Sequence, residues 1–197
     1  FSLREDLKPF FITINARNGA LIENARIFFE LFFANKVYLK PVDDIRQTLI
    51  DAKVQFDTNC QQIGSEVLEQ FLEYKTDHFP VQFLRLIGSA QYCFTERQNL
   101  LAHLKEVAII ASNLAERLDM DPLLAKRYGF FHDIGKIPFQ HCNGKNQIED
   151  GVYIAKHFEL DADIIDIIYK HHNKKDRNNP YLLIIKAADV LSAARPT

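Results

Sequence analysis

The feature that most constrains the fold is a run of apolar residues that recur every three or four positions between residues 45 and 71. Its members are Ile45, Leu49, Ala52, Phe56, Cys60, Ile63, Val67 and Phe71. This spacing places them on one face of an α-helix, whereas a half-buried strand would need a period of two. Pro41, a residue common in the first helical turn, precedes the run. The sequence therefore predicts one long amphipathic helix.

Most of the remaining chain carries the same helical period. Segments with this pattern are 20–35, 80–87, 98–118, 122–133, 147–157, 162–171 and 180–194. Segment 20–35 is apolar at nearly every turn, which predicts burial on most of its faces. Residues 10–14 (FFITI) are apolar and partly β-branched, which predicts one short strand. A mainly α fold follows, with an all-α C-terminal two-thirds.

Composition and charge exclude several classes of partner. The net charge of -2 and the pI of about 6.4 give no overall nucleic-acid footprint. Any RNA or nucleotide would therefore be held by a local patch or a metal. Cys60, Cys93 and Cys142 lie far apart without a C-x-x-C pair, which predicts free thiols in a reducing cytoplasm. No apolar run approaches the roughly 20 residues of a membrane span, so we expect no membrane contact by this fragment.

Four side chains combine imidazole and carboxylate groups near predicted helix faces or ends. His103 and Asp189 share inward stripes with apolar neighbours, and the adjacent pair His132 and Asp133 closes the helix between them. Singly, they could be a hydrogen-bonded core histidine, a helix end with a solvated acid and a buried salt bridge. A buried carboxylate is costly unless it pairs with a cation or a metal. The set together predicts a site for a divalent metal, whether Mn, Mg, Zn, Fe, Ni or Co, and favours a transition metal.

Lys136 stands three residues after Asp133, where it could neutralise a phosphate beside the metal. A bound cation makes water nucleophilic near neutral pH and polarises a phosphoryl oxygen. We therefore expect Asp133 and Lys136 to act in catalysis. A basic run adds positive charge near the predicted site and makes Lys174 and Lys175 further candidates for substrate phosphate, although such runs are most often solvated loops. The run consists of Lys170, Lys174, Lys175 and Arg177.

His103, the His132–Asp133 pair and Asp189 form an H…HD…D pattern that resembles the HD-domain metal-dependent phosphohydrolases. Longer strings are similar to those of the ribonuclease Y family of bacterial endoribonucleases. These strings are QNLLAH (98–103), LAKRYGFFHDIGK (124–136) and AADVLSAARP (187–196). The resemblance implies an all-α HD-domain helical bundle over residues 98–197. It also implies a helical connector over 41–97 and a small α/β remnant of a KH domain over 1–40.

The resemblance further implies a metal-dependent phosphodiesterase that cleaves single-stranded RNA through metal-activated water. Its metal ligands would be His103, His132, Asp133 and Asp189. The family also implies a parent protein with a membrane anchor at its N-terminus. A cytoplasmic location of this fragment and a homodimer are separate expectations.

Two departures from the family pattern bear on this expectation. The GxxG loop with which a KH domain grips RNA is absent from the sequence. The second metal site of the family would draw on His171, His172 and position 147, where this chain has Gln147 instead of a histidine. A neutral amide is a poorer ligand than imidazole, and His141 has the wrong spacing to replace it. The first metal site is therefore the stronger prediction.

Two alternatives remain open. The chain could be a nucleotide or cyclic-dinucleotide phosphohydrolase of the HD superfamily, which short nucleotide substrates would distinguish from an RNase. It could also be a catalytically degenerate HD domain that serves as a binding module, as Gln147 and the eroded KH remnant suggest. Metal-dependent hydrolysis of any phosphodiester would exclude this second alternative.

Overall fold

The computed structural model describes residues 12–15, 19–95, 98–140, 142, 144, 146–173 and 179–194. Within these residues the fold is helical, with short 3-10 and π segments and no strand, which confirms the predicted mainly α class. The α-helices are α1 (Gly19–Ala34), α2 (Val42–Glu66), α3 (Val81–Ser89), α4 (Leu100–Arg117), α5 (Pro122–Phe131), α6 (Gln147–His157), α7 (Ala162–Lys170) and α8 (Pro180–Ala193).

The strand predicted over residues 10–14 is wrong where it can be judged. Ile12, Thr13 and Ile14 have no regular secondary structure, and residues 10 and 11 lie outside the described part of the chain. A strand satisfies its backbone hydrogen bonds through a neighbouring strand, and the described residues offer no such neighbour. The α/β character expected for residues 1–40 is therefore absent from their described part, which contains helix α1.

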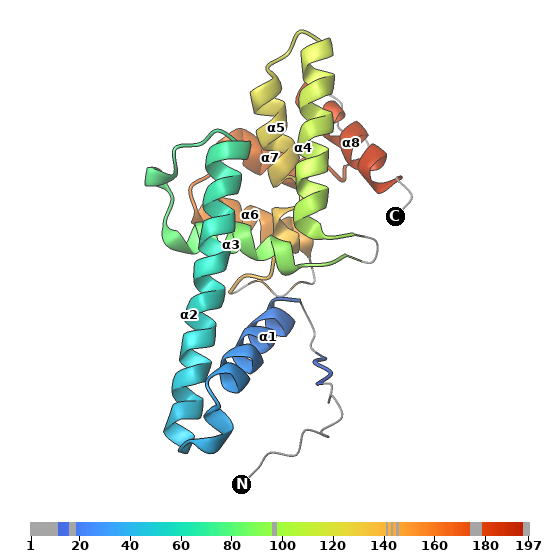
Figure 1. The fold of residues 1–197 in the computed structure, drawn as a ribbon. Coiled ribbons are helices and arrows are strands. Elements are labelled where there is room, and N and C mark those ends of the chain that lie inside the picture. Colours follow the sequence, from blue (N-terminus) through green and yellow to red (C-terminus); the bar gives the residue numbers. More distant parts are fainter. Residues whose placement is uncertain are drawn as a thin grey trace.

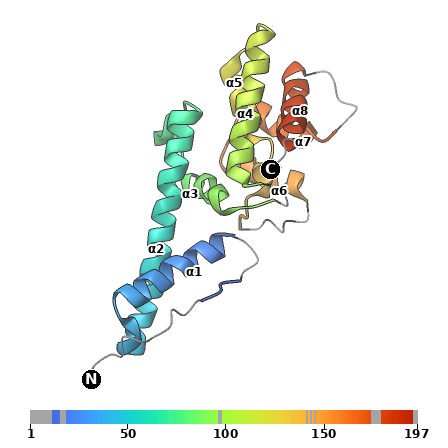
Figure 2. The ribbon, with the colours of Figure 1, turned by 45° about the vertical axis from the view of Figure 1, so that its right-hand side comes forward.

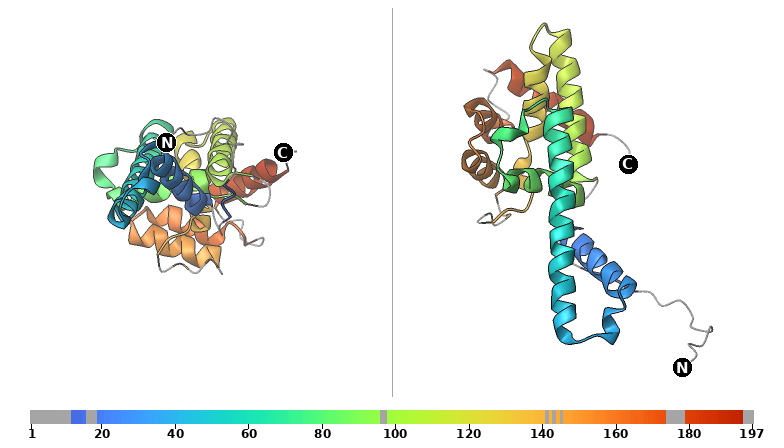
Figure 3. Two further views of the ribbon diagram at one scale, coloured as in Figure 1. Left: turned by 60° about the horizontal axis from the view of Figure 1, so that its bottom comes forward. Right: turned by 60° about the vertical axis from the view of Figure 1, so that its left-hand side comes forward.

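The long helix predicted after Pro41 is present as α2, continued by a π-helical segment over Val67–Phe71. It runs from α1 at one end of the molecule to the bundle formed by α4 to α8 at the other (Figure 1). α1 packs against the half of α2 that projects from this bundle (Figure 2). α3 contacts α2 where the long helix meets the bundle (Figure 3). The apolar face of α2 thus packs against α1 at one end of the helix and against α3 at the other.

The main hydrophobic core lies inside the bundle and extends to α3. Aromatic rings fill much of it: Phe83 of α3 lies 4.8 Å from Phe158 and 6.3 Å from Phe131, measured between ring centroids. A smaller core joins α1 to α2 through Ile27, Phe56 and their neighbours. The end of α5 is therefore anchored by buried aromatic packing.

The expected burial of α1 on most of its faces is wrong. Ile27 is its buried residue, while Leu21 is 55% exposed and Phe33 is 38% exposed. An apolar helix is buried only where neighbouring elements cover it. Within the described residues, α1 packs chiefly on α2, which covers one side.

Two glycines allow α2 and α3 to approach closely. A Cβ added to Gly64 of α2 would lie 1.9 Å from the carbonyl oxygen of Leu84, and one added to Gly88 of α3 would lie 1.8 Å from that of Cys60. Neither position has room for a side chain without a backbone shift. The contact therefore fixes α3 against the long helix.

Among the described residues, we find no helix with the length and apolarity needed to cross a lipid bilayer.

Candidate metal centre

His103 enters the centre from the first turns of α4. The side chain of Asn99 caps this helix by accepting a hydrogen bond from the backbone N–H of Ala102 at 3.1 Å. The cap fixes where α4 starts, and His103 follows one turn later on its inward face. The residue is 4% exposed.

His132 and Asp133 lie where α5 ends. Asp121 caps the other end of this helix by accepting from the backbone N–H groups of Leu123 and Leu124. His132 is the C-cap residue that follows the last residue of α5, and Asp133 precedes a 3-10 turn, η5 (Ile134–Lys136). His132 is 1% exposed and Asp133 is 4% exposed. The chain therefore turns sharply at the point where it presents both groups.

Gly135 holds this turn against the start of α6. A Cβ added to Gly135 would lie 2.0 Å from the carbonyl oxygen of Gln147 and 2.5 Å from the backbone nitrogen of Gly151. A side chain at this position would push η5 away from α6. The glycine that follows the His132–Asp133 pair therefore has a packing role.

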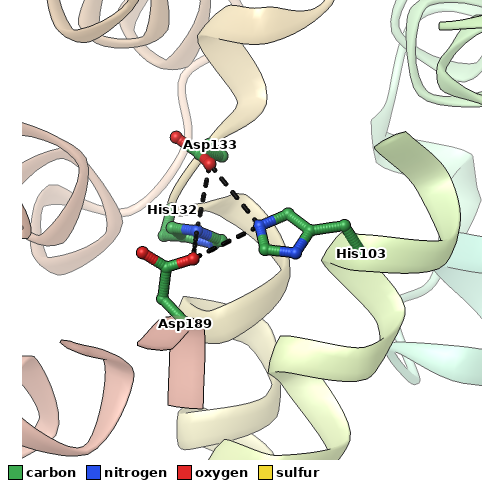
Figure 4. Close-up of side chains that lie close together, drawn as sticks. All are labelled: His103, His132, Asp133 and Asp189. Carbon is green, nitrogen blue, oxygen red and sulfur yellow. Dashed lines mark ion pairs between the residues drawn. The ribbon is translucent and has the colours of Figure 1, made fainter. Parts of the chain in front are cut away.

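Asp189 reaches the same point from α8, so three helices supply the four side chains (Figure 4). Nε2 of His132 lies 3.2 Å from Oδ2 of Asp133 and 3.6 Å from Oδ1 of Asp189. Nε2 of His103 lies 3.6 Å and 3.4 Å from the same two oxygens. The four potential ligand atoms lie within 4.8 Å of one another. The structure thus brings together His103, His132, Asp133 and Asp189.

A second group shares Asp133. Nε2 of His171, at the end of α7, lies 3.5 Å from Oδ1 of Asp133, the oxygen that does not face His103 and His132. His171 is buried, whereas the adjacent His172 is exposed and contacts it with ring centroids 3.9 Å apart and ring planes tilted by 42°. The ligand atoms of Asp133, His171 and His172 also lie within 4.8 Å of one another. Asp133 therefore presents one carboxylate oxygen to each group.

Hydrogen bonds fix the tautomers of two of these histidines. Nδ1 of His132 lies 2.7 Å from the carbonyl oxygen of Gly129, and Nδ1 of His171 lies 2.8 Å from that of Ile168. A carbonyl only accepts, so each Nδ1 must carry a proton and donate it. In the neutral rings, each Nε2 then bears a lone pair that points toward carboxylate oxygens.

These Nε2 atoms are buried and have no hydrogen-bond partner. Lone pairs facing carboxylates in a buried site are costly unless a cation lies between them. A divalent metal, or a proton in its absence, would satisfy both sets of atoms. The donor set therefore fits a divalent metal.

The pKa values of the four side chains are shifted in the directions that favour a positive charge beside the carboxylates. Burial lowers the pKa of His132, but the nearby carboxylates outweigh it and raise the pKa to about 9. The pKa of His103 is also raised, because Asp133 and Asp189 outweigh the effect of burial. Conversely, burial raises the pKa of both carboxyl groups, but the histidines dominate and the net pKa of each is lowered.

Lys136 forms an ion pair with Oδ2 of Asp133, and its side chain is 24% exposed. Gln147 is exposed at the first position of α6. Lys170 pairs with Asp166 at 2.6 Å. The remaining predicted residues, Lys174, Lys175, Arg177 and His141, lie outside the described residues.

A pocket of about 390 Å³ borders the second group. His172 lines it together with Tyr169, which is 65% exposed, and Asn173. Glu149 and Asn146 line its other side, near the start of α6. The pocket gives a ligand room beside His172 and offers it an aromatic face and polar groups.

Sequence reasoning missed Ser192 and Glu106, which lie behind His103. Ser192 is 2% exposed, and its hydroxyl lies 3.0 Å from Nδ1 of His103. Glu106 accepts a hydrogen bond from this hydroxyl at 2.8 Å. Their spacing was the available signal, because Glu106 is three residues after His103 and Ser192 is three after Asp189.

Comparison with known proteins agrees with this geometry. Residues 100–194 match the family described as HD domain, and these residues belong to that family. The resemblance inferred from the H…HD…D pattern is thereby confirmed.

Beyond this domain, most of the chain is similar to proteins named ribonuclease Y. The protein from Malacoplasma penetrans is 33% identical over 189 residues, which are 94% of this chain and 38% of that protein. The protein from Ureaplasma parvum is 34% identical over 186 residues, with the same two coverages. That from Helicobacter pylori is 39% identical over 132 residues, or 67% of this chain and 24% of the relative. The chain thus spans less than two-fifths of these relatives. No solved structure matches it.

Proposed function

We propose that the chain is a metal-dependent phosphodiesterase and, more specifically, a ribonuclease Y-like endoribonuclease that cleaves single-stranded RNA. The observation that carries the proposal is Asp133, which presents one oxygen to His103 and His132 and the other to His171. HD-domain membership and the similarity to proteins named ribonuclease Y support the reaction class.

His103, His132, Asp133 and Asp189 would hold the metal, with His171 and His172 available for a second ion that shares Asp133. The imidazole and carboxylate mixture favours a transition metal over Mg²⁺. A bound metal ion of this kind lowers the pKa of a water ligand and polarises a phosphoryl oxygen. The fixed Nδ1 protons of His132 and His171 keep their Nε2 lone pairs turned toward the ion.

Lys136 would bind the substrate phosphate. Its ammonium group pairs with Asp133 at the edge of the centre and remains partly exposed. A phosphate that approaches the centre would therefore meet this positive charge, which stabilises negative charge as it develops on the phosphate oxygens. We place Lys174 and Lys175 in the same role from their position in the sequence.

RNA is favoured over a generic phosphodiester by the pocket beside His172. Single-stranded RNA is commonly bound by stacking its bases on exposed aromatic rings, and Tyr169 offers such a ring next to the second group. Asn173 and Asn146 supply amide groups along the same pocket. These features suit a nucleotide that follows or precedes the cleaved phosphate.

The test is cleavage of a single-stranded RNA oligomer with Mn²⁺ by the wild type and by Asp133→Asn. Asp119→Asn is the matched control, because Asp119 is exposed beyond the end of α4, whose last residue is about 21 Å along the helix from His103 at 1.5 Å per residue. We expect the wild type and Asp119→Asn to cleave, and Asp133→Asn to lose activity. Cleavage of cyclic dinucleotides alone would favour the small-nucleotide phosphohydrolase, and no metal-dependent hydrolysis would favour a binding module.

We further propose that residues 1–40, 41–97 and 98–197 correspond to the KH-like remnant, the connector and the HD domain. The HD match from residue 100 supports the last boundary. A cytoplasmic location is supported by the three free cysteines. Homodimer formation stays a prediction, which light scattering of the purified chain would test.

A further inference from the structure

A buried hydrogen-bond chain ends on the ring of His103, on the side away from the proposed metal. Ser192 Oγ lies 3.0 Å from Nδ1 of His103 and 2.8 Å from Oε2 of Glu106. Residues three apart lie on one face of a helix. α4 therefore presents His103 with Glu106, and α8 presents Asp189 with Ser192. The two pairs meet where these helices pack together.

The direction of the hydrogen bonds from His103 through Ser192 to Glu106 follows from which of these groups can donate a proton. The Glu106 carboxylate only accepts, and the single hydroxyl proton of Ser192 is directed to it. Ser192 therefore has only lone pairs to offer to His103, so Nδ1 of that ring must carry the proton. Nε2 is left with its lone pair, and it faces Asp133 at 3.6 Å and Asp189 at 3.4 Å.

Gln98 competes for the same ring nitrogen. Its Nε2 lies 2.7 Å from Nδ1 of His103, an arrangement in which the amide would donate and the ring would accept. Turning the amide by 180° places its oxygen there instead, with almost no change of shape. A carboxylate has no such alternative, so Glu106 decides the direction and Gln98 adapts to it.

We propose that Glu106 and Ser192 are positioning residues that hold His103 in the tautomer and orientation needed to bind metal. The inference rests on the proposed function only in taking this centre as a metal site. Backbone carbonyls do the same for His132 and His171, whereas His103 depends on two side chains from two helices. Loss of either side chain leaves Gln98 to set the proton on Nδ1, and its amide can hold either tautomer.

The first test is Mn²⁺ affinity, measured by titration calorimetry on the whole chain. Loss of such a partner of a ligating histidine typically weakens metal binding by roughly 10-fold to 100-fold. We expect this loss in Ser192→Ala and in Glu106→Gln. Ser192→Thr keeps the hydroxyl and should stay within about threefold of the wild type. Glu116→Gln makes the same change at an exposed position of α4 and should have no effect.

The second test reads the His103 tautomer directly by ¹⁵N NMR of the metal-free protein at alkaline pH, where the ring is neutral. The wild type should carry its proton on Nδ1. In Glu106→Gln the new amide can either accept from Ser192 or donate to it, so the proton should no longer stay on Nδ1 alone and the Nε2 tautomer should appear beside it. This readout is independent of metal binding and of any change in overall stability.

Three results would overturn the proposal. They are a wild-type chain that binds no Mn²⁺, Ser192→Ala and Glu106→Gln variants that bind it within twofold of the wild type, and a Glu106→Gln ring that keeps the wild-type tautomer. The RNase proposal fails separately. If the wild type binds Mn²⁺ with the predicted losses but does not cleave RNA, that function is wrong and the positioning role stands.

Discussion

Replacing Gly135 with alanine should disturb the metal centre through backbone packing alone. The new Cβ would lie 2.0 Å from the carbonyl oxygen of Gln147 and 2.5 Å from the backbone nitrogen of Gly151. Non-bonded heavy atoms pack at roughly 3.5 Å, so η5 and α6 would have to separate by more than about 1 Å. Overpacking of this kind costs about 1–3 kcal/mol. We expect Gly135→Ala to lose stability by about this amount.

The same displacement would reach the chemistry, because Asp133 and Lys136 flank Gly135. A catalytic group misplaced by about 1 Å can cost on the order of 100-fold in rate. We therefore expect Gly135→Ala to bind Mn²⁺ at least about 10-fold more weakly and to cleave RNA about 100-fold more slowly. Asp133 would still be present, so the loss would come from its position and not from its chemistry.

Urea denaturation of the metal-free chain measures the loss of stability, and Mn²⁺ titration measures the loss of affinity. Gly144→Ala is the control: a Cβ there meets nothing within 4 Å, but the φ of 68° is unfavourable for alanine. It should cost roughly 1–2 kcal/mol through this strain and leave Mn²⁺ binding unchanged. The reasoning is refuted if Gly135→Ala unfolds within about 0.5 kcal/mol of the wild type and binds Mn²⁺ equally well.

Three further predictions concern metal binding and the reactivity of the thiols. A chelator should lower the thermal midpoint of the metal-loaded chain by roughly 5 to 10 °C, because a ligand at 100 times its Kd stabilises the fold by about 2.7 kcal/mol. An unchanged midpoint would count against the metal site. The Mn²⁺ affinity measured by calorimetry should rise as the pH increases toward 9. Burial lowers the pKa of His132, but the nearby carboxylates outweigh burial and raise this pKa to about 9, so protons compete with the metal below that pH. An affinity that does not change with pH would contradict this. Burial raises the thiol pKa to about 12 for Cys60 and about 11 for Cys93, so mass spectrometry after alkylation at pH 8 should find Cys142 modified first.

Much of the helical fold could be predicted from the sequence because apolar period is a local property. The run from Ile45 to Phe71 became α2 and its π-helical continuation. Burial depends on neighbours instead, and this is where prediction failed. The apolar segment of α1 has α2 on one side, so Leu21 and Phe33 are exposed. The strand predicted at residues 10–14 lacked a pairing partner in the described chain.

The candidate centre was predictable in part. The stripes of α4 and α8 predicted inward positions for His103 and Asp189, and the structure brings both to the His132–Asp133 pair, with His103 buried and the Asp189 side chain 29% exposed. Gln147 was named as a weak ligand for a second metal because it is an amide, and the structure places it, exposed, at the first position of α6.

The partners behind the ligands could not be predicted. Pairing Ser192 with Glu106 requires knowledge of which faces of α4 and α8 meet, and a helical period does not contain that information. The close contact of Gly135 with α6 is hidden for the same reason, because it joins segments whose relative placement depends on the whole core.

The central claim is that Asp133 lies at the heart of a metal centre, and the metal content of the purified chain tests it most directly. The measurement is elemental analysis of the wild type, Asp133→Asn and Asp119→Asn, each prepared without chelator. We predict at least one equivalent of a divalent transition metal in the wild type and in Asp119→Asn, and its loss in Asp133→Asn. A wild type without metal, or an Asp133→Asn chain that keeps it, would contradict the account.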